Sequence, residues 1–313
     1  MPAERVLLTG ATGFVGRTLL APLAARGFAV HAVTHGAQPA NTATAATWHR
    51  ADLLDEAEAR HLVREVRPAI LVHAAWYVIH GRFWTAPENA AWVEASAALA
   101  HAFAEAGGRR ILGLGTCAEY ADAAPEGGGA PWPESRPLAP ATPYGQAKAE
   151  LARRLGALAE RHGRLSCAWA RLFHLFGEGE HPERLVPSVI RALLAGREAA
   201  CASGRPVRDF AGTRHVGRAL AALTASGVEG PVNVASGRGL PIRVLVETIG
   251  RLAGRPDLIR LGRLPDRPNE APYVVADTTR LVREAGFAEP ADLERDLAAL
   301  IAAIAAEASP TIG

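Results

Sequence analysis

The sequence predicts a doubly wound α/β fold with a parallel sheet, followed by a smaller α/β C-terminal domain. Three observations lead to this prediction. Short apolar runs alternate with helical stretches, a glycine-rich loop follows the first run, and beyond about residue 173 the pattern shortens and Pro and Gly interrupt it. Alternating strands and helices favour a parallel sheet with helices on both faces. A chain of 313 residues is long enough for two modest domains.

The predicted elements follow one another along the chain. Strand-like runs occupy 6–9, 28–34, 69–73, 110–114 and 165–172. Helical stretches such as 87–106 lie between them, and an amphipathic helix is expected at 291–309. The segment 121–143 is rich in Gly and Pro. We expect it to lie outside the core and to cover an active site.

Three glycines directly follow the first predicted strand: Gly10, Gly13 and Gly16. Glycine is needed where a backbone turns tightly and approaches a pyrophosphate, and the next helix offers N–H groups and a positive dipole end. The spacing is Gly-x-x-Gly-x-x-Gly, not the Gly-x-Gly-x-x-Gly of the plain dinucleotide fingerprint. Its place between a strand and a helix predicts a Rossmann-type dinucleotide site.

Tyr144 and Lys148 are one helical turn apart, so their side chains share one face of a predicted helix. A tyrosine has an unperturbed pKa of about 10, and an adjacent cation is expected to lower it. Thr116, just after the run at 110–114, can hold a substrate carbonyl or hydroxyl against the phenol. We predict that these three side chains form a catalytic proton relay.

Bulk composition excludes several classes of function. The formal charge of +2 is too small to indicate a nucleic-acid partner. The three cysteines are scattered and give neither a disulfide framework nor metal-ligand spacing, so no metal is expected. The chain opens on a predicted strand and contains no apolar stretch of about 20 residues, so neither a signal peptide nor a membrane span is expected. A soluble cytoplasmic protein is the resulting prediction.

Several motifs occur together and in a fixed order. GATGFVG at 10–16, HAAW at 73–76, GTCAEY at 115–120 and PYGQAK at 143–148 are followed by RLFHLFG, LVPSVI, RPVRDF, GPVNVASG and RPNEAP. With them the chain resembles, over almost its whole length, the extended short-chain dehydrogenase/reductase family in its nucleotide-sugar epimerase/dehydratase/reductase branch.

The resemblance implies domains, a cofactor site and an assembly. A dinucleotide-binding domain is expected at 1–172 with about 212–235, and a substrate-binding domain at 173–211 and 236–313. The implied NAD(P) contacts are Gly10, Thr12, Gly13, Phe14, Val15, Gly16, His35, Asp52, Leu53, Ala74, Ala75, Tyr144 and Lys148. A homodimer formed through two helices per subunit is typical of the family, and the alanine-rich stretch 87–106 could serve.

The choice of cofactor depends on the end of the second strand. An NAD enzyme usually has Asp or Glu there to hold the ribose 2′-hydroxyl. The sequence has His35 and Gly36 instead and no Arg directly after them. The site therefore tolerates a 2′-phosphate, which His35 could contact, and NADP is weakly favoured. A loop histidine that faces water is the alternative.

The residues after Thr116 bear on the reaction. Sugar 4,6-dehydratases of the family follow this Thr with an Asp-Glu pair, where this chain has Cys117 and Ala118. Dehydration is therefore disfavoured. The resemblance favours reduction of a nucleotide-linked 4-keto-6-deoxyhexose at C4. A 4-epimerase or reductase-epimerase with tightly bound NAD is the alternative, and a non-catalytic NAD(P)-binding protein is the alternative from another class.

Substrate contacts follow from the same resemblance. Arg208 and Arg267 are candidates for the nucleotide diphosphate, because a guanidinium matches phosphate oxygens. A surface salt bridge with Asp209 or Glu270 is the alternative for either arginine. The full set of expected substrate contacts is Trp76, Tyr77, Cys117, His174, His181, Leu185, Val186, Arg208 and Arg267. The chain departs from the family near Trp92, where a supporting Asn is usual and Asn89 lies one turn away. It also departs at Gly212 and His215, which replace a His and an Asp.

Overall fold

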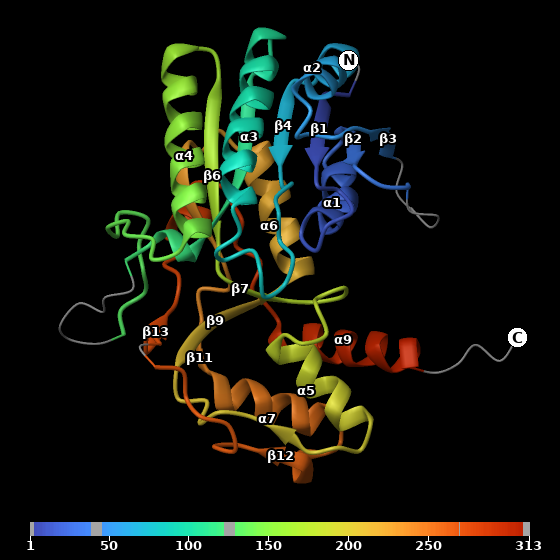
Figure 1. Ribbon diagram of the computed structural model, residues 1–313, viewed down its shortest axis with the longest axis vertical. Coiled ribbons are helices and arrows are strands. Elements are labelled where there is room, and N and C mark those ends of the chain that lie inside the picture. Colours follow the sequence, from blue (N-terminus) through green and yellow to red (C-terminus); the bar gives the residue numbers. More distant parts are fainter. Residues whose placement is uncertain (1–2, 39–45, 122–128, 269, 309–313) are drawn as a thin grey trace, which may run out of the picture.

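The computed structural model describes residues 3–38, 46–121, 129–268 and 270–308, and its larger part is built on a seven-stranded parallel sheet (Figure 1). Its strands are β1 (Arg5–Thr9), β2 (Ala29–Thr34), β3 (Ala46–Arg50), β4 (Ile70–His73), β5 (Arg110–Thr116), β6 (Ser166–Leu172) and β10 (Gly230–Val234). Their order is β10-β6-β5-β4-β1-β2-β3. The predicted doubly wound fold is confirmed. The strand order reverses beside β1, which is where such sheets bind ligands.

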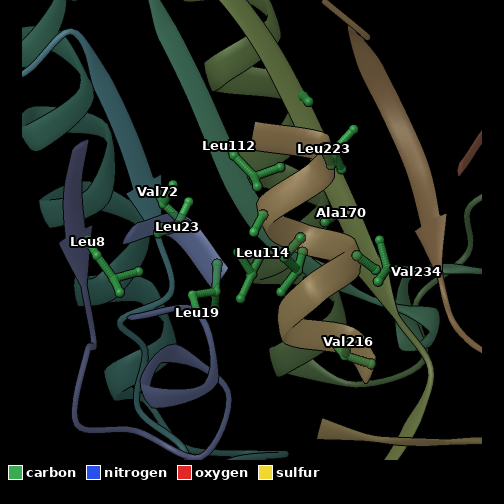
Figure 2. Close-up of a cluster of buried hydrophobic side chains, with 14 of the residues drawn as sticks. Leu8, Leu19, Leu23, Val72, Leu112, Leu114, Ala170, Val216, Leu223 and Val234 are labelled. Carbon is green, nitrogen blue, oxygen red and sulfur yellow. The ribbon is translucent and has the colours of Figure 1, made fainter. Parts of the chain in front are cut away.

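Helices cover both faces of this sheet. One face carries α1 (Leu20–Ala25), α6 (Thr213–Ala225) and α8 (Thr279–Arg283); the other carries α2 (Glu56–Val66), α3 (Glu88–Glu105) and α4 (Pro143–Arg161). Figure 2 shows Val216 and Leu223 of α6 in the same cluster of buried side chains as Leu112 and Leu114 of β5. Because both faces are buried, the central strands are apolar along their length, as the sequence indicates.

A second layer of structure lies beyond the carboxyl ends of these strands (Figure 1). It contains the strands β7 (His174–Phe176), β8 (Ala199–Ala200), β9 (Val207–Gly212), β11 (Gly239–Pro241), β12 (Ile259–Arg260) and β13 (Tyr273–Val274), and the helices α5 (Leu185–Leu194), α7 (Ile242–Leu252) and α9 (Leu293–Ala308). The three helices share an apolar core. We propose that this layer is the substrate-binding domain expected at 173–211 and 236–313, except that α8 of the second range packs on the seven-stranded sheet.

The sequence predicts that the Gly- and Pro-rich segment before α4 lies outside the core. The structure shows that part of this segment is buried. Residues 122–128 lie outside the described part. Trp132, however, is only 4% exposed and packs edge-to-face on Tyr120, with ring centroids 5.8 Å apart. Its backbone N–H donates to Val275 O over 2.7 Å. An aromatic side chain therefore anchors this segment between the sheet and the strand β13.

Within the described ranges, none of the helices combines the length and the apolar character needed to cross a membrane.

Candidate active site

The glycine loop packs closely against the neighbouring backbone because Gly10 and Gly16 have no side chains. Gly10 has a φ of +65°, and a Cβ there would lie 2.7 Å from Ala75 N. A Cβ on Gly16 would lie 2.1 Å from Gly10 O. Ala74 N and Ala75 N both donate to Thr9 Oγ1 over 3.2 Å, which ties the end of β4 to the end of β1. This close-packed cradle fits the pyrophosphate of a dinucleotide.

Replacing Gly16 with Ala is expected to weaken NAD(H) binding at least tenfold and to destabilise the protein by about 1–3 kcal/mol, because the added methyl forces the loop open. Cofactor fluorescence titration and thermal unfolding would measure both effects. Gly156→Ala, in open space on α4, is the matched control: it should keep cofactor affinity and increase stability by about 0.5–1 kcal/mol. Unchanged cofactor affinity in Gly16→Ala would contradict this role for the loop.

The remaining cofactor candidates lie at the same edge of the sheet. Asp52 N donates to Glu58 Oε2 over 2.7 Å, and Asp52 Oδ1 accepts from Leu54 N over 2.9 Å. His35 is 79% exposed in its side chain and lies 3.8 Å from Asp52 Oδ1. Leu53 is buried, Phe14 and Val15 are half-buried, and Thr12 and Gly13 are exposed. An adenosine here would meet Asp52 and His35 together.

Thr116, Tyr144 and Lys148 lie together where β5 ends and α4 begins. Thr142 caps α4 by accepting from Gly145 N over 3.2 Å, and Pro143 occupies its first turn. Tyr144 N donates to Trp84 O over 3.1 Å, and its ring packs edge-to-face on Phe83 and Trp84. The Thr116 hydroxyl lies beside the Tyr144 phenol and acts to lower its pKa.

Burial sets the protonation of this pair, which corrects one expectation from the sequence. The pKa of Tyr144 is raised, first by burial and then by Glu119 and Cys117, while the Thr116 hydroxyl and the charge of Arg184 oppose the rise. Burial lowers the pKa of Lys148 to about 7 against the opposing effect of Glu119. The predicted lowering of the Tyr144 pKa by Lys148 is therefore absent, and at neutral pH the phenol keeps its proton.

The ammonium of Lys148 points to a different aromatic residue. It donates to Leu114 O over 2.9 Å and lies 3.7 Å from the centroid of Trp76, but 6.0 Å from that of Tyr144. Trp76 Nε1 in turn donates to Asn89 Oδ1 over 2.9 Å. Trp76, expected among the substrate contacts, thus supports Lys148 through a cation–π contact. Asn89 positions Trp76.

Glu119 is a residue that the sequence did not single out. It is fully buried one residue before Tyr120, and its carboxylate pairs with Arg171 over 2.8 Å. The partner lies 52 positions later in the sequence, on β6. The sequence signal for Glu119 was its charge close to Thr116. This signal is weak, because a charged side chain is usually exposed to solvent.

The two arginines proposed for the diphosphate differ in their surroundings. Arg208 is buried on β9, pairs with Glu270 over 2.8 Å and donates to Val207 O. Asp209 faces away from it and accepts from Ser236 N, Gly237 N and Ala276 N. Arg267 is exposed. A diphosphate would have to compete with Glu270 for Arg208, whereas Arg267 is accessible to it.

The other substrate candidates come from both layers of the structure. His174 begins β7, packs on Phe210, and has a pKa lowered to about 3 by burial and by Arg208 and Arg184, so it is neutral. Its Nδ1 is buried without a hydrogen-bond partner in the described part of the chain. Tyr77, Cys117 and Leu185 are half-buried, and Val186 lies in the apolar core with α7 and α9.

His181 stacks on His80, with ring centroids 4.3 Å apart and the planes inclined by 19°. With Glu183 they place three ligand atoms within 4.8 Å of one another. A metal bound by both imidazoles must lie near the plane of each ring, which nearly parallel stacked rings do not permit. In this arrangement the cluster joins two loops by stacking and is not a chelating site.

The sheet order, the glycine cradle and the Tyr–Lys pair define an extended short-chain dehydrogenase/reductase. A family model described as the NAD dependent epimerase/dehydratase family matches residues 6–235, and the chain belongs to this family. It is the family that the sequence motifs resemble.

Two curated relatives from Streptomyces illustrate the range of activities. A dTDP-glucose 4,6-dehydratase of Streptomyces griseus is 33% identical over 175 residues, which are 55% of this chain and 52% of the relative. The match thus spans about half the length of that relative. A UDP-glucose 4-epimerase of Streptomyces lividans is 29% identical over 276 residues, which are 80% of this chain and 82% of the relative.

Solved structures confirm the fold over the whole chain. The UDP-glucose 4-epimerase of Thermotoga maritima, solved with UDP-glucose, superimposes with a TM-score of 0.85 at 21% identity and covers 98% of this chain and 100% of its own. At this identity the likeness concerns the fold.

Proposed function

We propose that the protein reduces the 4-keto group of a nucleotide-linked 6-deoxyhexose, with NAD(P)H as hydride donor and Tyr144 as proton donor. The observation that carries this proposal is the partly buried phenol of Tyr144, which keeps its proton and lies beside Thr116. Reduction needs a proton at the developing alkoxide, which a protonated phenol supplies. Oxidation, the first half of an epimerisation, needs instead a base at that position.

The identity of residue 148 supports a catalytic role. The chain contains 34 lysines and arginines, and Lys148 is the only lysine among them. An arginine in its place could hold a charge but could not release a proton, since its pKa lies above about 12. A chain that otherwise uses arginine throughout has a titratable amine here, 4% exposed and beside Tyr144. A non-catalytic binding protein would not need it.

Each of the three residues has a separate task in the proposed reaction. When bound, the nicotinamide supplies the hydride to C4. Tyr144 transfers its phenolic proton to the C4 oxygen, and Thr116 donates a hydrogen bond to the same oxygen, which stabilises the developing negative charge. Lys148 offers a positive charge to the phenolate that remains and a hydrogen-bond donor for the nicotinamide ribose. The phenolate regains its proton from solvent.

The same geometry argues against dehydration. Elimination of water from the sugar needs an acid or base next to Thr116, where the chain has Cys117 and Ala118. Glu119 is the carboxylate closest in sequence, but it is fully buried and paired with Arg171. An acid held by a guanidinium over 2.8 Å is not available for proton transfer to a sugar.

A 4-epimerase with tightly bound NAD is the second candidate. It is favoured by the relative that matches most of the chain, the UDP-glucose 4-epimerase of Streptomyces lividans. The two candidate reactions use the cofactor differently, because an epimerase retains NAD while a reductase consumes NADH or NADPH. We propose NADP as the preferred cofactor on the weak ground that His35, and no acid, follows β2. A homodimer in the cytoplasm remains a prediction.

Replacing Tyr144 with Phe should reduce turnover by about 10²–10⁴-fold, because the proton donor is lost while the ring and its packing remain. The measurement is single-turnover oxidation of NADH and of NADPH with a panel of nucleotide-linked 4-keto-6-deoxyhexoses. Tyr273→Phe removes a hydroxyl on β13 and should leave the rate unchanged.

Oxidation that disappears in Tyr144→Phe would establish the reductase. Interconversion of UDP-glucose-type sugars with retained NAD, and no net oxidation of added NAD(P)H, would favour the epimerase. Cofactor binding without either reaction would leave the non-catalytic alternative. The same experiment reports the preferred cofactor.

A further inference from the structure

Glu119 lies directly behind the catalytic side chains and takes no part in the proposed proton transfer. We propose that Glu119 is a positioning residue, whose buried carboxylate fixes the backbone of Thr116 and supplies the counter-charge for Lys148. The proposal rests on the function proposed above for Thr116, Tyr144 and Lys148. Its two parts depend on separate contacts.

The first part concerns the end of β5. Glu119 Oε1 accepts from Thr116 N over 2.8 Å, while Thr116 Oγ1 accepts from Ala118 N over 3.2 Å. This reciprocal pair is a capping box around the short 3-10 turn of Cys117–Glu119. It fixes the backbone from which the Thr116 hydroxyl reaches Tyr144. Glu119 therefore determines where the donor to the C4 oxygen lies.

A fully satisfied network keeps the carboxylate in place and charged. Trp169 Nε1 donates to both oxygens, over 3.0 and 3.1 Å, and Arg171 Nε donates to Oε2 over 2.8 Å. Arg171 Nη1 also donates to Tyr120 Oη over 3.1 Å, and Tyr120 Oη donates to Asn233 Oδ1 over 2.7 Å. Buried charges persist when they are paired and hydrogen-bonded in this way. Because this network holds the carboxylate, a substitution at Glu119 is expected to alter the position of the Thr116 backbone that it binds.

The second part concerns the charge of Lys148. Three titratable groups are relevant to its ammonium: His73 from β4 and Glu119 interact with it electrostatically, and the ring centroid of Tyr144 from α4 lies 6.0 Å away. His73 is neutral, because burial and Lys148 lower its pKa to about 3, and it bonds to Ser96 and Thr9. Around Tyr144 lie also Cys117 and Arg184.

Glu119 and Lys148 bind the same end of β5: the carboxylate accepts from Thr116 N over 2.8 Å, and the ammonium donates to Leu114 O over 2.9 Å. From this position the negative charge of Glu119 opposes the loss of the lysine's proton on burial. Without Glu119, the Lys148 amine would be neutral over more of the physiological pH range. The phenolate left after proton transfer would then lack a cation beside it.

The single lysine makes a direct test possible. Protein labelled with [13Cε]lysine gives one lysine resonance, whose shift against pH reports the titration of Lys148. Glu119→Gln should raise the proton dissociation constant of Lys148 by about tenfold or more. Trp169→Phe removes a neutral donor from the same carboxylate and should titrate like the wild type. This measurement needs no sugar substrate, so its failure is distinct from failure of the proposed reaction.

Glu119→Asp separates the two parts and provides the second variant. It keeps the charge, so the lysine should titrate within about threefold of the wild type, but its shorter side chain withdraws from Thr116 N. We expect kcat to fall about tenfold with little change in KM. A folded Glu119→Gln protein whose lysine titrates as in the wild type would overturn the counter-charge. A Glu119→Asp protein with wild-type kcat would overturn the positioning of Thr116.

Discussion

Lys148→Met should make the protein more stable at neutral pH while it reduces turnover by about 100-fold or more. The buried ammonium is needed beside Tyr144 but costs free energy of folding, because burial lowers its pKa from 10.5 to about 7. That difference of about 3.5 pKa units corresponds to a cost on the order of 5 kcal/mol, which a methionine of similar length avoids. Met also keeps a favourable contact with the Trp76 ring.

The pH dependence of this gain has a definite sign. Between pH 7 and 10.5 the unfolded chain binds more protons at Lys148 than the folded chain, so the stability of the wild type rises with pH in that window. The advantage of Lys148→Met should therefore be largest below about pH 7 and shrink as the pH approaches 10.5. Thermal unfolding of both proteins at a series of pH values measures it.

Lys148→Arg is the matched control, since arginine keeps the positive charge and does not lose its proton. It should show no stabilisation at any pH. A Lys148→Met protein that is less stable than the wild type at pH 7 would show that the lysine contributes more through Leu114 O and Trp76 than burial of its charge costs.

Features with a local cause could be predicted from the sequence. The glycine loop is an example: Gly10 needs a positive φ and Gly16 a close backbone approach, and both requirements are met by the residue type alone. The spacing of Tyr144 and Lys148 likewise fixes a shared helix face. The edge strand β3, by contrast, was missed, because it is largely polar. It pairs His49 with His31 of β2 by a 2.9 Å hydrogen bond.

Features with a non-local cause could not be predicted. Whether a Glu is solvated or buried depends on its partners, and Arg171 and Trp169 come from a strand that follows some fifty residues later. The same holds for Trp132, whose burial requires Val275 and Tyr120 as neighbours. The pKa of Tyr144 was misjudged because sequence spacing reports which charge is near but not how much water is excluded.

Arg171→Met should destabilise the protein by about 3–5 kcal/mol and lower Tm by roughly 5–15 °C. Arg171 is 5% and Glu119 0% exposed, so loss of the guanidinium leaves a buried carboxylate without its counter-ion. Burial alone would lower the pKa of Arg171, but Glu119 and Tyr120 more than offset this, and its pKa is raised. Loss of the donor to Tyr120 Oη adds to the cost.

The destabilisation should depend on pH in the direction opposite to that for Lys148. Without Arg171, the buried carboxylate of Glu119 has lost its counter-ion, which favours the protonated carboxyl in the folded variant. The variant should then approach the wild type in stability at low pH and fall behind as the pH rises. Urea unfolding at several pH values would show this trend.

Two further variants separate loss of the ion pair from loss of packing. Arg153→Met breaks the exposed pair with Glu150 and should change stability by less than about 1 kcal/mol. The double variant Glu119→Gln with Arg171→Met removes both charges and should recover part of the loss, since no buried charge is left unpaired. If the double variant is no more stable than Arg171→Met, the destabilisation comes from lost packing and hydrogen bonds on β6 and not from the unpaired charge of Glu119.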